Sequence, residues 1–170
     1  RGQLDEALRI RTEEELPVFQ RLGDVRSTAV TMGKIADILQ ARGQLDEALR
    51  IRTEEELPVY ERLGDVRERA VTLGRIADVL QSRGQLDEAL RIRSEEELPV
   101  YEGLGDVRST LVARVNIAIN LIIRGRPEDL PSANEHIVWA WRAATNHGFL
   151  PLKAQIEQLM QQMGIPVPVE

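Results

Sequence analysis

One stretch of the chain, RGQLDEALRIRTEEELPV, recurs at a fixed spacing. It begins at Arg1, returns unchanged at Arg42, and returns again at Arg83 with Ser94 in place of the threonine. The pair Arg124-Gly125 marks a fourth start, so each step is 41 residues. A period of this length is typical of repeat proteins, in which each unit buries its apolar side chains against its neighbours.

Each unit contains two segments with helical apolar spacing, separated by glycines. The first, helix A, is predicted at residues 24–41, 65–82 and 106–124, with Gly23 ending the helix before it and Asp24 capping its first turn. The second, helix B, is predicted at 3–22, 44–63 and 85–104, with acidic residues in its first turn, where the helix dipole favours them. No segment alternates polar and apolar residues as a strand would, so we expect an all-α fold.

Prolines lie well inside helix B, at Pro17, Pro58 and Pro99. Proline removes one backbone hydrogen bond and crowds the preceding turn, and the apolar spacing also slips in the residues before each proline. Two readings remain open: a continuous helix with a kink or π-bulge just before each proline, or a break into two short helices. We favour the continuous helix.

The C-terminal part departs from the repeat. Residues 107–123 are far more apolar than their counterparts, a helix is predicted at about 132–147, and a last amphipathic helix at 150–163. A helical array needs an end unit with a different outer surface. We therefore expect a single solenoid domain, 1–170, of about eight helices, with units starting at 1, 42, 83 and 124, a divergent cap at 126–165 and a tail at 166–170. The abrupt start inside the repeat suggests a fragment of a longer protein.

Composition argues against several classes of function. The net charge is −6 with basic and acidic residues interleaved, which does not favour a nucleic-acid partner. There are no cysteines, and therefore no disulfides or thiolate metal sites. No apolar run approaches the roughly 20 residues of a membrane span and no signal peptide opens the chain. We expect a cytoplasmic protein with no membrane partner.

No catalytic signature is present, neither a glycine-rich phosphate loop nor a Ser-His-Asp arrangement. His136 and His147 lack a nearby third ligand, so no metal site is expected. The runs Glu13–Glu15, Glu54–Glu56 and Glu95–Glu97 recur on every unit, which a single active site would not need. We interpret them, with the arginines before them, as an ion-pair ladder within helix B and between neighbours. The expectation is a protein without catalytic residues or cofactors.

Residues Ala70 to Arg93, AVTLGRIADVLQSRGQLDEALRIR, resemble a tetratricopeptide repeat (TPR). The match lies in Ile76-Ala77, in Leu80, in the turn at Gly84, and in the Asp-Glu-Ala-Leu of helix B. The Leu63-Gly64-Asp65 before helix A is similar to the class with units of about 40–42 residues, as in kinesin light chain and bacterial arrays. The resemblance implies a right-handed α-solenoid of antiparallel helix pairs with helix A lining the concave face. It also implies binding of a partner's peptide or helix without catalysis, and a role in bacterial signalling.

Two features depart from the family pattern. The Lys and Asn residues with which some members grip a terminal carboxylate are not reproduced. The aromatic and small residues usual midway along helix B fall here on Arg52 and the run Glu54–Glu56.

If the family geometry holds, helix A presents its partner-binding residues to the concave groove. Gly33 and Gly74 sit mid-helix, where glycine costs about 1 kcal/mol relative to alanine. A neighbouring helix or a ligand that approaches closely would explain that cost, and both readings carry equal weight. The predicted groove residues are Val30, Gly33, Lys34, Asp37, Gln40, Val71, Gly74, Arg75, Asp78, Gln81 and Asn116.

The third helix A would add an apolar floor made by Val112, Val115, Ile119 and Ile122. This floor either receives an amphipathic partner or is covered by the last helices of the chain, and we favour the covering.

The leading hypothesis is a protein–protein interaction scaffold or sensor that binds a peptide or helix in the helix A groove. The alternative is a structural array that self-associates through helix 3–22, where Leu4, Leu8, Val18 and Leu22 would expose an apolar end.

Overall fold

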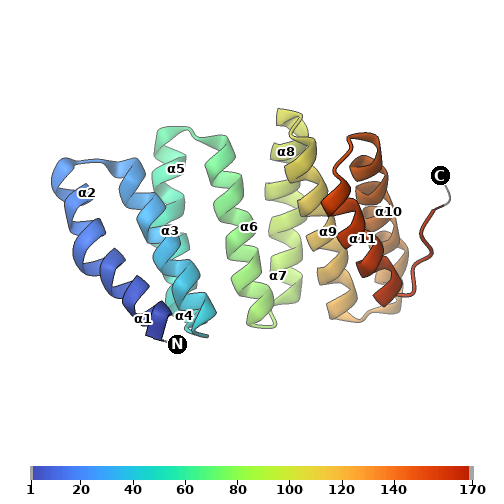
Figure 1. Ribbon diagram of the computed structural model, residues 1–170, viewed down its shortest axis with the longest axis horizontal. Coiled ribbons are helices and arrows are strands. Elements are labelled where there is room, and N and C mark those ends of the chain that lie inside the picture. Colours follow the sequence, from blue (N-terminus) through green and yellow to red (C-terminus); the bar gives the residue numbers. More distant parts are fainter. Residues whose placement is uncertain (1, 169–170) are drawn as a thin grey trace. The chain divides into compact units, whose positions relative to one another are not determined.

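The computed structural model describes residues 2–168, and every element in that range is helical (Figure 1). The chain forms two compact units, Arg1–Gln85 and Leu86–Glu170. The first holds α1 (Gly2–Arg9), η1 (Ile10–Glu15), α2 (Leu16–Leu22), α3 (Val25–Ala41), α4 (Leu45–Arg50), η2 (Ile51–Glu56), α5 (Leu57–Leu63) and α6 (Val66–Ser82). The second holds α7 (Leu86–Arg91), η3 (Ile92–Glu97), α8 (Leu98–Leu104), α9 (Val107–Arg124), η4 (Pro127–Asp129), α10 (Leu130–Asn146) and α11 (Leu150–Gln162).

Contiguous segments make eight helices in the described range, and helix A corresponds to α3, α6 and α9. The predicted all-α, TPR-like pattern of helix pairs recurring every 41 residues is confirmed. That residues 1–170 form one domain stays a prediction.

Helix B is continuous in all three copies. In each, an α segment passes without a gap into a six-residue π-helix and then into a second α segment. The π segment has the sequence Ile-Arg-Thr/Ser-Glu-Glu-Glu and ends two residues before the proline. The return from π to α geometry leaves a carbonyl without its usual N–H partner, and proline has no N–H to offer. The continuous reading is therefore correct, and a break into two helices is wrong.

Helix A begins where the sequence places its cap. The Ser27 N–H donates to Asp24 Oδ1 at 3.0 Å, and equivalent bonds to Asp65 and Asp106 are 3.1 Å long. The glycine before each of these aspartates has φ between 63° and 66°, a left-handed conformation that ends helix B. The cap and the glycine together fix the start of helix A in every unit.

The core of the first unit is shared between its helices. Ile35, Ala36 and Leu39 of α3 pack with Ala48 and Ile51 of helix B, and Val79 of α6 joins the same cluster. Fully buried alanines let the helices approach closely, so that each helix pair shares its apolar interior with the next.

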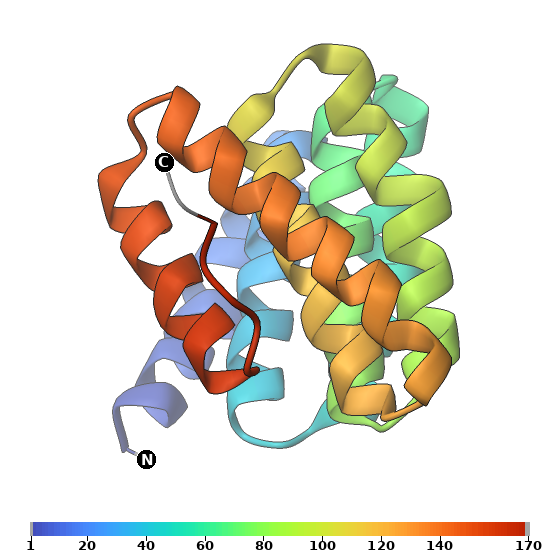
Figure 2. The same cartoon turned by 90° about the vertical axis from the view of Figure 1, so that its right-hand side faces the viewer.

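In the second unit α9 packs against the helix formed by α7, η3 and α8 and against α10. Figure 2 shows α10 and α11 joined by a short turn. The Trp141 Nε1–H donates to Glu157 Oε1 at 2.9 Å across these two helices. α10 begins at Leu130, two residues before the predicted start at 132. The turn before it is held by Arg124, which donates to both carboxylate oxygens of Asp129 at 2.5 and 2.7 Å.

Exposed ion pairs follow the repeat. In the first unit Arg50 bonds to Glu47 and Glu55 along its own helix, at 2.8 and 2.7 Å. One Arg–Asp pair between helices recurs with the repeat: Arg83 lies 3.0 Å from Asp46, and the equivalent pairs are Arg42 with Asp5 and, in the second unit, Arg124 with Asp87. The predicted ladder is confirmed within helix B, whereas these pairs between helices do not involve the three-glutamate runs. Each exposed pair contributes less than about 1 kcal/mol.

The sequence places Asn120 of α9 where the other copies of helix A have Ile38 and Val79. Its side chain is fully buried, and neither its oxygen nor its nitrogen has a hydrogen-bond partner in the described part of the chain. Replacing a buried, unpaired amide with an apolar side chain removes a desolvation penalty of about 1–3 kcal/mol. Asn120→Val should therefore raise the free energy of unfolding, measured by chemical denaturation. The converse change, Val79→Asn, should lower it. A loss of stability in Asn120→Val would contradict this account.

Candidate functional site

The predicted groove residues of the first unit divide by exposure. On α3, Val30, Lys34 and Asp37 are exposed and Gln40 is half-buried. On α6, Val71 and Arg75 are exposed, whereas Asp78 and Gln81 are half-buried. We call these eight residues the helix A surface.

Three further predicted residues lie elsewhere. Gly33 and Gly74 are buried beneath the helix A surface, and Asn116 is half-buried on α9 of the second unit.

Several contacts join α3 and α6 within the first unit. Both helices contact η2, and the Arg26 Nη2–H donates to Asp65 Oδ2 at 2.6 Å between their first turns. These contacts hold α3 and α6 in place relative to each other, and the exposed side chains of both helices are therefore presented from a rigid support.

A buried ion cluster, formed by Asp37, Arg52, Glu56 and Thr72, lies below this surface. Arg52 is 1% exposed, and its Nη1–H donates to Glu56 Oε2 at 2.9 Å. Its Nη2–H donates to Asp37 Oδ1, and the Thr72 hydroxyl donates to Glu56 Oε1 at 3.3 Å. The cluster thus connects three helices through one guanidinium and one carboxylate.

Gly33 makes room for this cluster. A Cβ atom placed on Gly33 would lie 2.5 Å from Glu56 Oε1, closer than real Cβ atoms come to other atoms. Of the two readings of the mid-helix glycine, a neighbour's side chain is the correct one at Gly33, because the Glu56 carboxylate occupies the space.

Asp37 connects the buried cluster to the surface. Its side chain is 50% exposed, whereas the Arg52 side chain that binds it is 2% exposed. One carboxylate oxygen accepts a hydrogen bond from the buried Arg52, whereas the group as a whole remains accessible to solvent. Lys34, one turn earlier on α3, is exposed, so the surface carries both signs of charge within one turn.

Burial also changes the acidity of Glu56. Loss of solvent raises the pKa of this carboxyl above its ordinary value, and the positive charge of Arg52 and the hydrogen bond from Thr72 oppose that shift only in part. The cluster has one cation for two carboxylates when all are ionised, which is why Asp37 adds to the upward shift.

Sequence reasoning did not identify the buried ion cluster. It interpreted each three-glutamate run as part of an ion-pair ladder, whereas in the second copy Glu54 is exposed, Glu55 half-buried and Glu56 buried. The available signal was the arginine that stands where the TPR pattern has a packed residue, four positions before the third glutamate.

The third copy of helix A lacks the cluster altogether. The places of Gly33 and Asp37 hold Val115 and Ile119, and the places of Arg52 and Glu56 hold Asn134 and Val138 on α10. All four positions change together, so the α9–α10 pair needs neither a buried ion nor a glycine to accommodate it.

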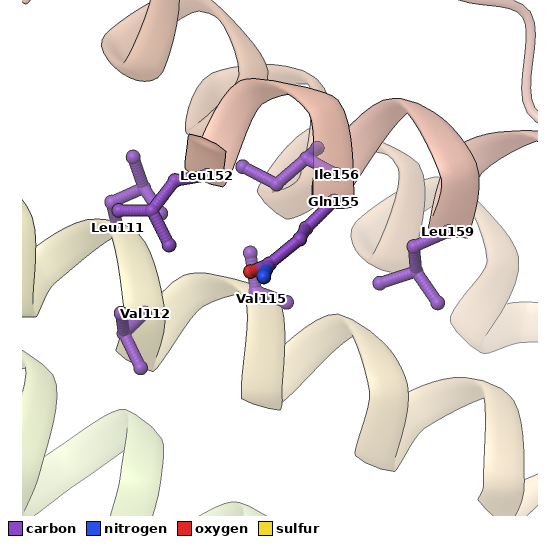
Figure 3. A pocket seen from close by; sticks show the side chains of 7 residues that line it. All are labelled: Leu111, Val112, Val115, Leu152, Gln155, Ile156 and Leu159. Atoms are coloured by element: carbon purple, nitrogen blue, oxygen red, sulfur yellow. The ribbon is translucent and has the colours of Figure 1, made fainter. Parts of the chain in front are cut away.

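The apolar floor of α9 is covered by the end of the chain. α11 lies beside α9 and leaves a cavity of about 190 Å³ lined by Leu111, Val112, Val115, Leu152, Gln155, Ile156 and Leu159 (Figure 3). Residues 163–166 and the start of α10 line a second cavity with Ile122. The predicted covering is confirmed in part: the last segments lie against Val115 and Ile122, which are half-buried, whereas Val112 remains 41% exposed.

The two histidines have separate surroundings in the second unit. His136 Nδ1 lies 3.5 Å from Arg114 Nη1. The pKa of His136 is lowered mainly because the ring is removed from solvent, and the positive charge of Arg114 lowers it further. His147 stacks on Phe149. Within residues 2–168 no three His, Asp or Glu side chains are grouped to hold a metal. No helix in that range is both long and apolar enough to span a membrane.

Comparisons with known proteins give structural likeness only. No family model and no curated protein matches the chain. A kinesin light chain candidate from Podospora anserina with nearly identical TPR-like repeats is 19% identical, with a TM-score of 0.48, over 95% of this chain and 89% of that one. A single-substitution variant of that protein is 18% identical, with a TM-score of 0.49, over 96% and 89% of the two chains.

Gly33→Ala should destabilise the protein, although alanine favours a helix by about 1 kcal/mol over glycine. The new methyl group would displace the Glu56 carboxylate, which is held by Arg52 and Thr72. Gly103→Ala is the matched control, because that position lies on a helix with no atom within 4 Å of an added Cβ, and it should gain stability. Urea denaturation would measure the free energy of unfolding of both variants. An equal increase in both would contradict the close approach of the Glu56 carboxylate to Gly33.

Glu56→Gln should change how stability depends on pH. Because the folded pKa of Glu56 is raised above 4.5, the folded chain binds this proton at a higher pH than the unfolded chain does. Relative to Glu56→Gln, the unchanged protein should therefore gain stability as pH falls through the folded pKa toward 4.5, and lose it as pH rises. Denaturation midpoints of both proteins across this range would measure the difference. A difference that stays constant with pH would rule out the raised pKa.

Proposed function

We propose that this protein is a protein–protein interaction module that binds a peptide or helix of a partner on the helix A surface, with no catalysis of its own. The observation that carries the proposal is Asp37, a half-exposed carboxylate bound from below by a fully buried arginine. A charged group held in place in this way loses little conformational freedom on binding, so less of the interaction energy is spent on ordering it.

The surroundings of Asp37 support the same proposal. Lys34 and Val30 lie about one and two turns before it on α3, and the same spacing recurs on α6 as Arg75 and Val71 before Asp78. Both valines are at least 36% exposed. A partner segment with an apolar side chain and charges of both signs would complement this pattern.

The repeat of the pattern on two helices favours an elongated ligand over a small molecule. A peptide or helix is long enough to contact exposed side chains of both helices at once. The proposed setting is a cytoplasmic adaptor or sensor, as the sequence resemblance to bacterial arrays suggests.

A second candidate function is self-association through the first helix. Val18 is 40% and Leu22 73% exposed on α2, whereas Leu4 and Leu8 are half-buried. Light scattering over a range of protein concentrations separates the two candidates, because the interaction module needs no second copy.

The double variant Lys34→Glu/Arg75→Glu should lose binding to peptides that a random display library selects against the unchanged protein. The expected loss is tenfold or more in affinity, about 1.4 kcal/mol, since two charges of the surface are reversed. Arg21→Glu/Arg62→Glu is the matched control, with the same change in net charge at exposed, equivalent positions on helix B. Helicity by circular dichroism confirms that both variants fold. Selected peptides that bind both variants equally well, or a library that yields no binder, would refute the proposal.

A further inference from the structure

The helix formed by residues 2–22 has the same side chains on one face as the helix of residues 43–63, where another helix covers that face. Residues 2–22 and 43–63 differ only at Phe19/Tyr60 and Gln20/Glu61. In the second copy, α3 packs along all three segments of helix B and buries this face. We call the corresponding residues of the first copy, Ala7, Ile10, Arg11, Glu15 and Val18, the outer face of helix 2–22.

The two copies differ in exposure but not in local geometry. The Arg11 Nη1–H donates to Glu15 Oε2 at 2.8 Å, as Arg52 does to Glu56 at 2.9 Å. The side chains of the first pair are 27% and 38% exposed, whereas those of the second pair are 2% and 9% exposed. The ion pair therefore forms on the outer face without a helix that covers it, and this face has the same local arrangement as its buried equivalent.

The covering helix supplies two things to the second copy. Gly33 leaves the space that the Glu56 carboxylate enters, and the Asp37 carboxylate accepts a hydrogen bond from Arg52 Nη2. In the first copy, the described residues give Arg11 no carboxylate other than Glu15. A helix that packs on the outer face in the same way would therefore need a glycine and, four residues later, an aspartate.

The glycine–aspartate pattern of helix A and the arginine–glutamate pattern of helix B occur next to each other in the sequence. The Gly-x-x-x-Asp pair occurs at Gly33/Asp37 and at Gly74/Asp78, and each is followed by an Arg-x-x-x-Glu pair in the next helix B. Where helix A changes to Val115 and Ile119, the following helix has Asn134 and Val138 instead. Each helix A of this chain that has the Gly-x-x-x-Asp pair is followed by an Arg-x-x-x-Glu pair, and the helix A that lacks the first pair is followed by a helix that lacks the second.

We propose that the outer face of helix 2–22 is a docking site for an α-helix that carries the Gly-x-x-x-Asp pattern among apolar residues. Its aspartate accepts a hydrogen bond from Arg11, and its glycine admits the Glu15 carboxylate. A larger residue in place of the glycine would collide with Glu15. A lysine in place of the aspartate would set two positive charges side by side, so the site rejects helices without the pattern. This site is separate from the helix A surface and does not rest on the proposed function.

The test adds such a helix to the full chain. A copy of residues 24–41 joined before Arg1 reproduces the junction between residues 41 and 42, since Arg1-Gly2-Gln3 repeats Arg42-Gly43-Gln44. In the extended chain, amide hydrogen exchange within residues 4–15 should slow at least tenfold relative to the 170-residue chain. An added copy with Gly33→Val and Asp37→Lys is the matched control and should give no such protection.

Arg11→Gln supplies the second readout. It should lower the midpoint of thermal unfolding more in the extended chain than in the 170-residue chain, because only there does Arg11 hold an aspartate. Arg9→Gln, a change to an arginine two residues away that bonds to Glu6 and Glu14, should shift the midpoint equally in both chains.

Three results would overturn the inference. The first is unchanged exchange in the extended chain, and the second is equal protection by the control copy. The third is dimerisation of the 170-residue chain, seen by sedimentation and abolished by Arg11→Glu, because the occupant would then be a second copy of the chain. None of these results bears on the helix A surface, which is tested with other residues.

Discussion

An arginine and a glutamate that pair in the interior of the second repeat join its helix B to the two helices beside it. Removing two charges from water costs several kcal/mol per ion unless the pair is fully bonded. Arg52 and Glu56 gain further bonds from Asp37 of α3 and Thr72 of α6, which leaves the Arg52 Nε as the buried atom of the pair without a partner among the described residues. The pair therefore favours one register of the three helices over others in which these groups would be buried without partners. Gly33 is part of the same constraint, because any larger residue would occupy the space of the carboxylate.

The pair lies in the π-helical segment of helix B. The wider turn of this segment holds Ile-Arg-Thr-Glu-Glu-Glu in the same conformation in each copy, and proline follows where the chain returns to α geometry. The short ion pair of Arg11 and Glu15 forms even though it is partly exposed. The local sequence thus prepares the ion pair, and the neighbouring helix then determines how deeply it is buried.

The same cluster relates the core to the proposed binding surface. Asp37 belongs to both, since one of its oxygens accepts from a buried arginine while half of the side chain faces solvent. At the C-terminal end the cluster is replaced as a set, with Val115, Ile119 and Val138 in place of glycine and charges. There α11 and the residues after it pack against part of α9. The surface of helix A is thus charged and exposed in the first unit, whereas that of α9 is apolar and partly covered.

The sequence by itself determined the period, the all-α fold and the helix caps, because each depends on interactions within a few residues, and it favoured a continuous helix B over a broken one without deciding between them. It also predicted the covering of α9, from the excess of apolar residues there. It did not separate Gly33 from its exposed neighbours, nor Glu56 from Glu54, because those residues differ only in what lies opposite them. Arg11 and Arg52 have the same neighbours in sequence and the same bond to a glutamate, yet one is partly exposed and the other buried. Burial is a property of the pair of helices that meet, and only the tertiary structure decides which helix that is.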